Sequence, residues 1–190
     1  MKTAIHSSPT ALLTAEDLLR LDAQGVRGEL VRGVFREVTP AGYRHGMIVV
    51  RLAARLLDYA DERRCGTVVA SDAGILLERD PDTVREPDIA FTSADRLPPS
   101  AAPTGCSDVV PDLVVEVASP NDRPGELAER ADMWLGFGVR LVWVVHPESK
   151  TVEVRTADIH AVETLTEADR LDGTPTLPGF TYPLSQLFAD

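Results

Sequence analysis

The sequence is poor in lysine, aromatic residues and cysteine, and it has no long hydrophobic run. Its 190 residues include only two lysines, Lys2 and Lys150, against seventeen arginines. Apolar runs such as 113–115 and 141–145 are far shorter than the roughly 20 residues that cross a bilayer. Residues 1–14 carry one lysine and no apolar core, so they do not resemble a secretory signal. We therefore expect a cytoplasmic protein without a membrane partner.

The two cysteines, Cys65 and Cys106, stand alone, with no CxxC spacing and no histidine nearby in the sequence. Such spacing favours buried free thiols over metal ligands or a disulfide.

The net charge of −11 opposes non-specific binding to nucleic acid, because phosphate binding depends on Lys and Arg. This argues against a protein that coats DNA. A nuclease is not excluded, since its acids can hold a divalent cation and its DNA contacts can come from a local patch or from an oligomer.

The length, the apolar fraction of 44% and the charged fraction of 26% are typical of one globular domain over residues 1–190. Hydrophobic periodicity and turn residues predict three helices, over 14–24, 43–64 and 124–137. They predict strands over 29–32, 34–38, 67–70, 74–78, 88–91, 112–118, 139–145 and 151–155. We expect turns at 79–82 and 147–150, an irregular segment at 93–108 and a docked tail at 177–190. The pattern indicates a mixed β-sheet flanked by helices, of the α+β or α/β class.

Glu116 is the most informative residue, because it lies in the middle of the apolar strand predicted over 112–118. A buried carboxylate without a partner is costly, so something must compensate its charge. An arginine inside the fold, an edge-strand position facing water and a bound metal ion all remain open at this stage.

Asp88 stands at the head of another apolar strand, where by itself it would be an ordinary strand-start residue. Two adjacent strands that each carry one acid can, however, bring both carboxylates to one Mg²⁺ or Mn²⁺, which prefer hard oxygen ligands. Such a cation polarises a phosphodiester and lowers the pKa of an attacking water. The pair Asp88 and Glu116 therefore predicts a metal-dependent phosphodiesterase.

Three runs carry a family resemblance: EPDIAF at 86–91, PDLVVEVASP at 111–120, and GV at 138–139 with VWVV at 142–145. They resemble the Uma-two family of restriction endonucleases, in the PD-(D/E)XK nuclease superfamily. Segments 28–33, 40–45, 177–180 and 184–188 are similar to the family's other motifs, so the likeness covers nearly the whole chain. It implies an α+β, restriction-endonuclease-like fold and a metal-dependent endonuclease that cuts DNA.

Carried over residue by residue, the resemblance makes Asp88 and Glu116 the metal-binding catalytic acids and Glu29 a supporting acid near the metal. His45 shares the apolar stripe of the predicted 43–64 helix, where the pattern alone indicates a core histidine. The resemblance instead places His45 at the site.

The chain departs from the superfamily pattern at Ala118, where the superfamily has a catalytic lysine. In the Uma-two family that lysine has moved to the following helix, and counting back four residues from Trp134 gives Arg130. Arginine can stabilise developing negative charge but stays protonated, so it cannot act as a base. On the helix pattern, Arg130 would either lean towards Glu116 or form a surface pair with Glu126.

Three functions remain from different classes. The first is the metal-dependent endonuclease, for which a homodimer would present two sites to the two DNA strands. The second is a nuclease fold that has lost cleavage and serves as a binding or assembly module, which the acidity and the arginine at 130 favour. The third is a carboxylate-pair hydrolase such as a glycosidase, for which the scarce aromatic residues give no support.

Overall fold

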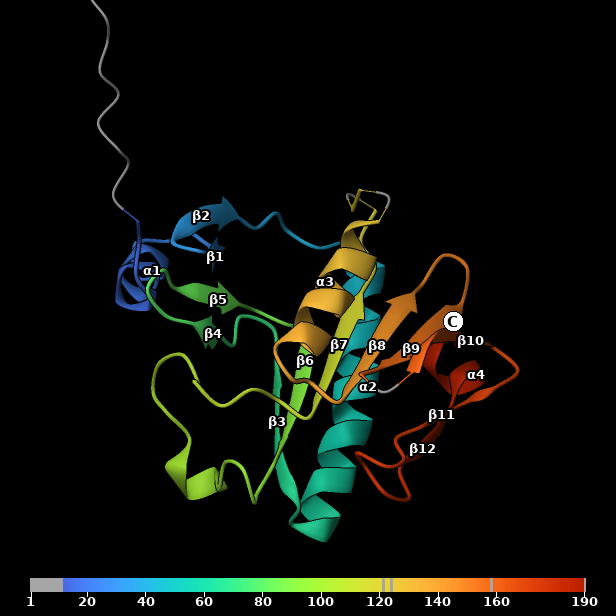
Figure 1. The fold of residues 1–190 in the computed structure, drawn as a ribbon. Helices are drawn as coiled ribbons and strands as arrows, with labels where there is room; N and C mark the ends of the chain where they lie inside the picture. The colour runs from blue at the N-terminus through green and yellow to red at the C-terminus, as the bar shows by residue number, and fades with distance from the viewer. Residues whose placement is uncertain (1–11, 121, 124, 158, 190) are drawn as a thin grey trace, which may run out of the picture.

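A mixed β-sheet of six strands, in the order β10-β9-β8-β7-β6-β3, forms the centre of the molecule (Figure 1). The structure is a computed structural model that describes residues 12–120, 122–123, 125–157 and 159–189. β7 and β8 run parallel, and the other neighbours are antiparallel. The strands are β3 (Gly66–Ala70), β6 (Ile89–Ser93), β7 (Leu113–Val117), β8 (Leu141–His146), β9 (Thr151–Thr156) and β10 (Ile159–Thr166).

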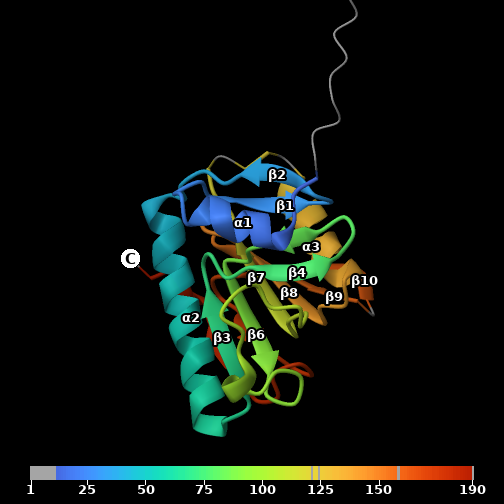
Figure 2. The ribbon, with the colours of Figure 1, turned by 90° about the vertical axis from the view of Figure 1, so that its left-hand side faces the viewer.

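Helices cover both faces of this sheet, α2 (Tyr43–Arg63) on one side and α3 (Glu126–Gly136) on the other (Figure 2). Alternate residues of β7 serve the two cores: Leu113 and Val115 join the core under α2, and Val114 joins the core under α3. Since β7 is buried on both faces, its sequence is apolar throughout apart from Glu116. This confirms the prediction of a strand inside a covered sheet.

A smaller sheet of four strands, in the order β2-β1-β5-β4, lies beside the main sheet and carries α1 (Ala15–Asp22) (Figure 1). The β1–β2 hairpin turns at Arg32 and Gly33, both with positive φ, as a two-residue turn between twisted strands requires. Thr14 caps α1 in a capping box with Asp17, which confirms the predicted helix start. The strands are β1 (Gly28–Val31), β2 (Val34–Glu37), β4 (Ile75–Glu78) and β5 (Thr83–Arg85).

The C-terminal segment docks on the body of the domain, as predicted, and lies on the α2 side of the main sheet. It forms β11 (Arg170–Asp172), β12 (Thr181–Pro183) and α4 (Leu184–Leu187). Its apolar side chains complete the core under α2, with Leu171, Leu177, Leu184, Leu187 and Phe188 all buried.

The α+β class and the mixed, helix-covered sheet are confirmed, but four strands were missed. The turn at 79–82 leads into β5 rather than directly to β6. β11 and β12 are only three residues long, and a register shift between Ile159 and Glu163 interrupts the alternation in β10. Segment 93–108 is irregular apart from the 3₁₀ turn η1 (Pro99–Ala101). Helix α3 begins at Glu126; Pro124, the predicted start, lies outside the described residues, as does Lys2.

Cys65 and Cys106 are free thiols and only half-buried, so the prediction of free cysteines holds and that of full burial does not. Over the described ranges, no helix combines the length and apolarity needed to cross a membrane.

Candidate active site

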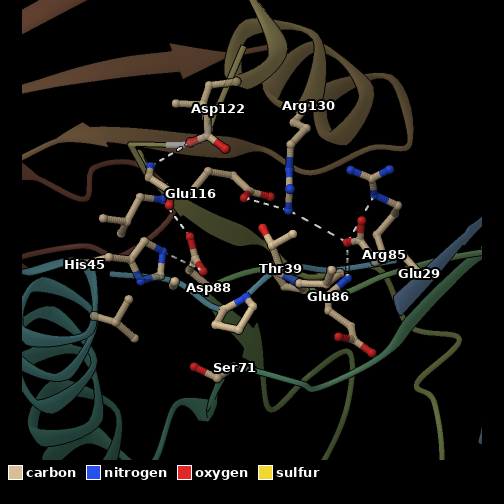
Figure 3. Close-up of a pocket in the computed structure, with 18 of the residues that line it drawn as sticks. Glu29, Thr39, His45, Ser71, Arg85, Glu86, Asp88, Glu116, Asp122 and Arg130 are labelled. Carbon is tan, nitrogen blue, oxygen red and sulfur yellow. Dashed lines mark hydrogen bonds and ion pairs between the residues drawn. The ribbon is translucent and has the colours of Figure 1, made fainter. Parts of the chain in front are cut away.

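A cleft of about 1020 Å³ lies where the small sheet meets the start of α2 and the adjacent ends of β6, β7 and α3 (Figure 3). All five side chains predicted for the site line this cleft: Glu29, His45, Asp88, Glu116 and Arg130. They come from five different elements or loops, so only the tertiary fold brings them together.

Asp88 and Glu116 are placed side by side by the pairing of β6 with β7. The antiparallel ladder ends with Ile89 facing Val115, and Asp88 and Glu116 are the next residues beyond it. The backbone N–H of Val117, which follows Glu116, donates to the Asp88 carboxylate. Figure 3 shows both carboxylates pointing into the cleft.

Asp88 is held by two contacts that fix the direction of its carboxylate. The backbone N–H of Val117 donates to Oδ2 at 2.7 Å, and His45 Nε2 lies 3.1 Å from Oδ1. The hydrogen bond to Asp88 raises the pKa of His45 against the opposing effect of burial, and the charges of Asp88, Asp122 and Glu116 add to the rise. His45 therefore faces the acids rather than the apolar core, and its side chain is only 10% exposed.

Glu116 is 1% exposed, and both of its oxygens are occupied. Trp134 Nε1 donates to Oε1 at 2.6 Å, and Arg130 Nη2 lies 2.9 Å from Oε2. Burial raises the pKa of Glu116, Arg130 and Trp134 lower it, and the charge of Asp88 raises it, so that the net pKa is about 7. An internal arginine thus compensates the carboxylate, and the edge-strand alternative is wrong because β7 has a neighbour on each side.

Arg130 leans towards Glu116, as one of the two helix alternatives predicted. The other alternative, a surface pair with Glu126, does not form. Glu126 instead accepts a hydrogen bond from Arg123 Nε at 3.2 Å. Burial lowers the pKa of Arg130, but the carboxylates of Glu116, Glu29 and Asp88 outweigh burial and raise it. The guanidinium is therefore a permanent positive charge at the cleft.

Glu29 lies one step further from the acid pair, behind Arg130. Its Oε1 is 3.7 Å from Arg130 Nη2 and 3.3 Å from Arg85 Nε, and it accepts from the backbone N–H of Glu86 at 2.9 Å. The Arg85 contact is an ion pair rather than an aligned hydrogen bond, since Nε finds no acceptor of good geometry in the described structure. Glu116, Arg130, Glu29 and Arg85 form a chain of alternating charge that joins the main sheet to the small sheet.

Arg85, Glu86 and Asp122 line the cleft but were not identified from the sequence. Burial, and then the nearby charge of Glu29, raises the pKa of Glu86 to about 7. Their one sequence signal is position: Glu86 is the first residue of the 86–91 motif, Arg85 directly precedes it, and Asp122 follows β7, where loops at strand ends meet. The sequence does not indicate that Arg85 pairs with an acid, because its partner Glu29 is remote in sequence.

Asp112 shows that a buried acid of the same motif can be purely structural. It lies at the opposite end of β7 from the cleft, 3.2 Å from Arg96 and 3.4 Å from Arg140. It also accepts from the backbone N–H of Ser93 at 2.8 Å. Of the two acids in the 111–120 run, only Glu116 therefore belongs to the site.

The donor set at the cleft fits a hard cation that keeps part of its water. Asp88 and Glu116 supply carboxylate oxygens, and each oxygen already contacted by the protein keeps a further lone pair. Among the described residues no group of three or more His, Cys, Asp or Glu side chains could enclose a metal. Mg²⁺ suits such a pair, since it is typically bound through one or two carboxylates and several waters.

The raised pKa of Glu116 predicts a specific pH dependence of stability in EDTA. The folded pKa lies near 7 and the unfolded value near 4.5, so folding takes up a proton between these pH values. The contribution of Glu116 is then most favourable below about pH 4.5 and is lost as the pH rises to 7, by roughly 3 kcal/mol. Urea unfolding from pH 5 to 8 should show Glu116→Gln gaining stability relative to wild type as the pH rises. A constant difference would contradict the raised pKa; Glu86 titrates equally in both proteins and cancels.

Comparison with known proteins places these observations in context. The Uma-two family model, described as "Putative restriction endonuclease", matches residues 15–185. A crystal structure from Anabaena variabilis, described as a "putative nuclease belonging to DUF820", is similar with a TM-score of 0.78 and 16% identity. The match covers 93% of this chain and 97% of that chain, and at this identity it shows a shared fold. Among curated proteins, none matches this chain.

Proposed function

This chain belongs to the Uma-two family, and we propose that it is a Mg²⁺- or Mn²⁺-dependent endonuclease that hydrolyses phosphodiester bonds of DNA. One observation carries the proposal: Asp88, directly before β6, and Glu116, in the adjacent β7, both line one cleft, and Arg130 lies beside Glu116. The glycosidase hypothesis gains no support, because no aromatic side chain is found in the described lining of the cleft.

Asp88 and Glu116 would hold the cation, which when bound polarises the phosphodiester and lowers the pKa of an attacking water. His45 and the Val117 amide keep the Asp88 carboxylate turned into the cleft. The guanidinium of Arg130 uses one N–H on Glu116 and has further N–H groups to donate to the phosphate as charge develops. Because Arg130 stays protonated, it stabilises charge and does not act as the base.

Plasmid cleavage tests this function directly. Wild-type protein with supercoiled plasmid and Mg²⁺ or Mn²⁺ should yield open-circular and linear DNA, and EDTA should prevent it. Arg130→Met should lower the rate by about 100-fold, because one donor to the developing charge is lost. Arg140→Met is the matched control, since Arg140 is exposed and pairs with Asp112 away from the cleft. Cleavage that continues in EDTA, or an Arg130→Met rate equal to wild type, would contradict the proposal.

A second candidate function, a nuclease fold that binds without cleaving, is favoured by one observation. Both oxygens of Glu116 already have partners, and Arg130 places positive charge beside the carboxylate that the cation would use. For this candidate, wild type should cleave with neither cation, and Arg130→Lys should gain cleavage. Cleavage by wild type at a rate similar to Arg130→Lys would exclude it.

A further inference from the structure

The solvent side of α2 carries a second apolar stripe, opposite the one that faces the core. Its members recur along the helix and are exposed: Tyr43 (90%), Met47 (36%), Val50 (69%) and Leu57 (46%), with exposed Ala54 between the last two. Figure 2 shows α2 at the outer margin of the molecule, with the sheet on its inner side. The core needs none of these side chains, since other residues of α2 face it: Ile48, Val49, Leu52, Leu56, Tyr59 and Ala60.

The spacing of this stripe is suited to packing against another helix. Positions 43, 47, 50, 54 and 57 alternate in steps of four and three, the repeat by which two helices interlock side chains in a coiled coil. One flank of the stripe carries small residues: Gly46, which has open space around its Cα, and Ala53, which is half-buried against the core under α2. A second helix can therefore approach that flank closely at Gly46.

The other flank carries charges of opposite sign at its two ends. Arg44 lies near the N-terminus of α2, and Asp58 lies two heptad steps later on the same flank. In an antiparallel pair of identical helices, Arg44 of each copy faces Asp58 of the other, giving two ion pairs about one two-fold axis. A parallel pair would instead place the flank of Arg44 and Asp58 against the flank of Gly46 and Ala53, which offers no charged partner.

Arg51 falls midway between these two positions and would meet its own counterpart at the two-fold axis. Its guanidinium is already engaged within the chain, donating to the backbone carbonyls of Leu187 and Ala189 at the C-terminal segment. It is thus drawn towards α4 and away from the centre of the stripe.

We infer that the outer face of α2 is a self-association surface, on which a second copy of this chain docks its own α2 in antiparallel orientation. The stripe from Tyr43 to Leu57 spans about 21 Å of helix. One helix pair of this length covers less than the roughly 800 Å² per partner of a standard stable interface. The dimer is accordingly expected to dissociate on dilution, with a Kd on the order of 10 μM.

This arrangement would set the two clefts apart. The cleft opens at the N-terminal end of α2, where His45 lies on the inner side of the helix. Antiparallel pairing then presents one cleft at each end of the helix pair. The inference does not depend on the proposed cleavage activity, since it rests on α2 alone.

Sedimentation equilibrium of the full chain from about 1 to 200 μM tests the inference. Wild type should show a monomer–dimer equilibrium, and Val50→Arg should remain monomeric across the range. Val34→Arg is the matched control, because Val34 is 46% exposed on β2 and lies outside α2. A wild type that stays monomeric, or a Val50→Arg protein that dimerises like wild type, would overturn the inference.

A charge swap tests the antiparallel orientation. Asp58→Arg should weaken dimerisation by about tenfold, because each of the two ion pairs is then replaced by two facing arginines, Arg44 of one copy and the introduced arginine of the other. Adding Arg44→Asp should restore the wild-type Kd. Among the described residues of one chain, Arg44 pairs with Glu148 and Asp58 with Arg55, and both pairs are exposed. The variants should therefore fold normally, which circular dichroism checks. Failure of the double variant to recover would refute the orientation. Glu116→Gln should dimerise like wild type, so loss of cleavage and loss of dimerisation can be told apart.

Discussion

Glu116→Gln should reduce plasmid cleavage by at least about 1000-fold, a loss of about 4 kcal/mol of transition-state stabilisation. The amide keeps the size of the side chain and still accepts from Trp134, but it removes one of the two carboxylates that would hold the cation. We expect the variant to fold, since it replaces a buried acid whose pKa is raised to about 7 by burial.

Initial rates of conversion of supercoiled plasmid, at saturating Mg²⁺ and at pH 8, provide the measurement. Glu129→Gln is the matched control, because Glu129 is exposed on the same helix as Arg130 and points away from the described cleft lining. Titration calorimetry with Mn²⁺ separates the causes: the variant should lose cation binding together with cleavage. Retention of more than a tenth of the wild-type rate would show that Glu116 is not a required ligand.

Trp134→Phe should destabilise the protein by about 3 kcal/mol, whereas Trp143→Phe should cost about 1 kcal/mol. Both indoles are fully buried, so the two substitutions remove similar apolar volume. They differ in the N–H: Trp134 donates to Glu116, and Trp143 Nε1 has no partner in the described structure. Loss of the Trp134 N–H leaves a buried carboxylate oxygen of Glu116 without its donor, whereas loss of the Trp143 N–H removes a group that has no partner.

Urea unfolding at pH 7.5 followed by circular dichroism measures both free energies of unfolding. The pH is chosen above the pKa of Glu116, so that the carboxylate is mostly ionised and the lost hydrogen bond is charge-assisted. Equal losses for the two variants would mean that the Trp134–Glu116 hydrogen bond adds nothing to stability.

Arg130, at the position where the family resemblance implies a lysine, defines what chemistry this cleft can perform. The pKa of a lysine beside Glu116 could be lowered enough for the lysine to exchange a proton. The guanidinium of Arg130 stays protonated and cannot exchange one. Arg130 is also held from two sides, by Glu116 and by Glu29, which Arg85 in turn neutralises. In the proposed enzyme the protein therefore contributes charge and orientation, and water activation depends on the cation.

Several features could be predicted from the sequence because they depend on local pattern. The apolar run of β7, interrupted only by Glu116, indicated a strand covered on both faces, and the stop signals around it placed the neighbouring strand and helix. The acid inside that run, Glu116, predicted a compensating partner. The helix pattern allowed Arg130 either to lean towards Glu116 or to pair with Glu126. The motif order from 28 to 188 predicted the family.

Only the tertiary structure decided how these parts meet. The pairing of β6 with β7 brings Asp88 near Glu116, and no local pattern specifies a register between strands so far apart in the chain. The Glu29–Arg85 pair and the separation of Asp112 from the cleft depend likewise on long-range packing. Helix α2 has apolar residues on two opposite faces, and the docking of the sheet and the C-terminal segment decides which one is buried. Periodicity predicts which residues share a face, but contact across the chain determines what each face meets.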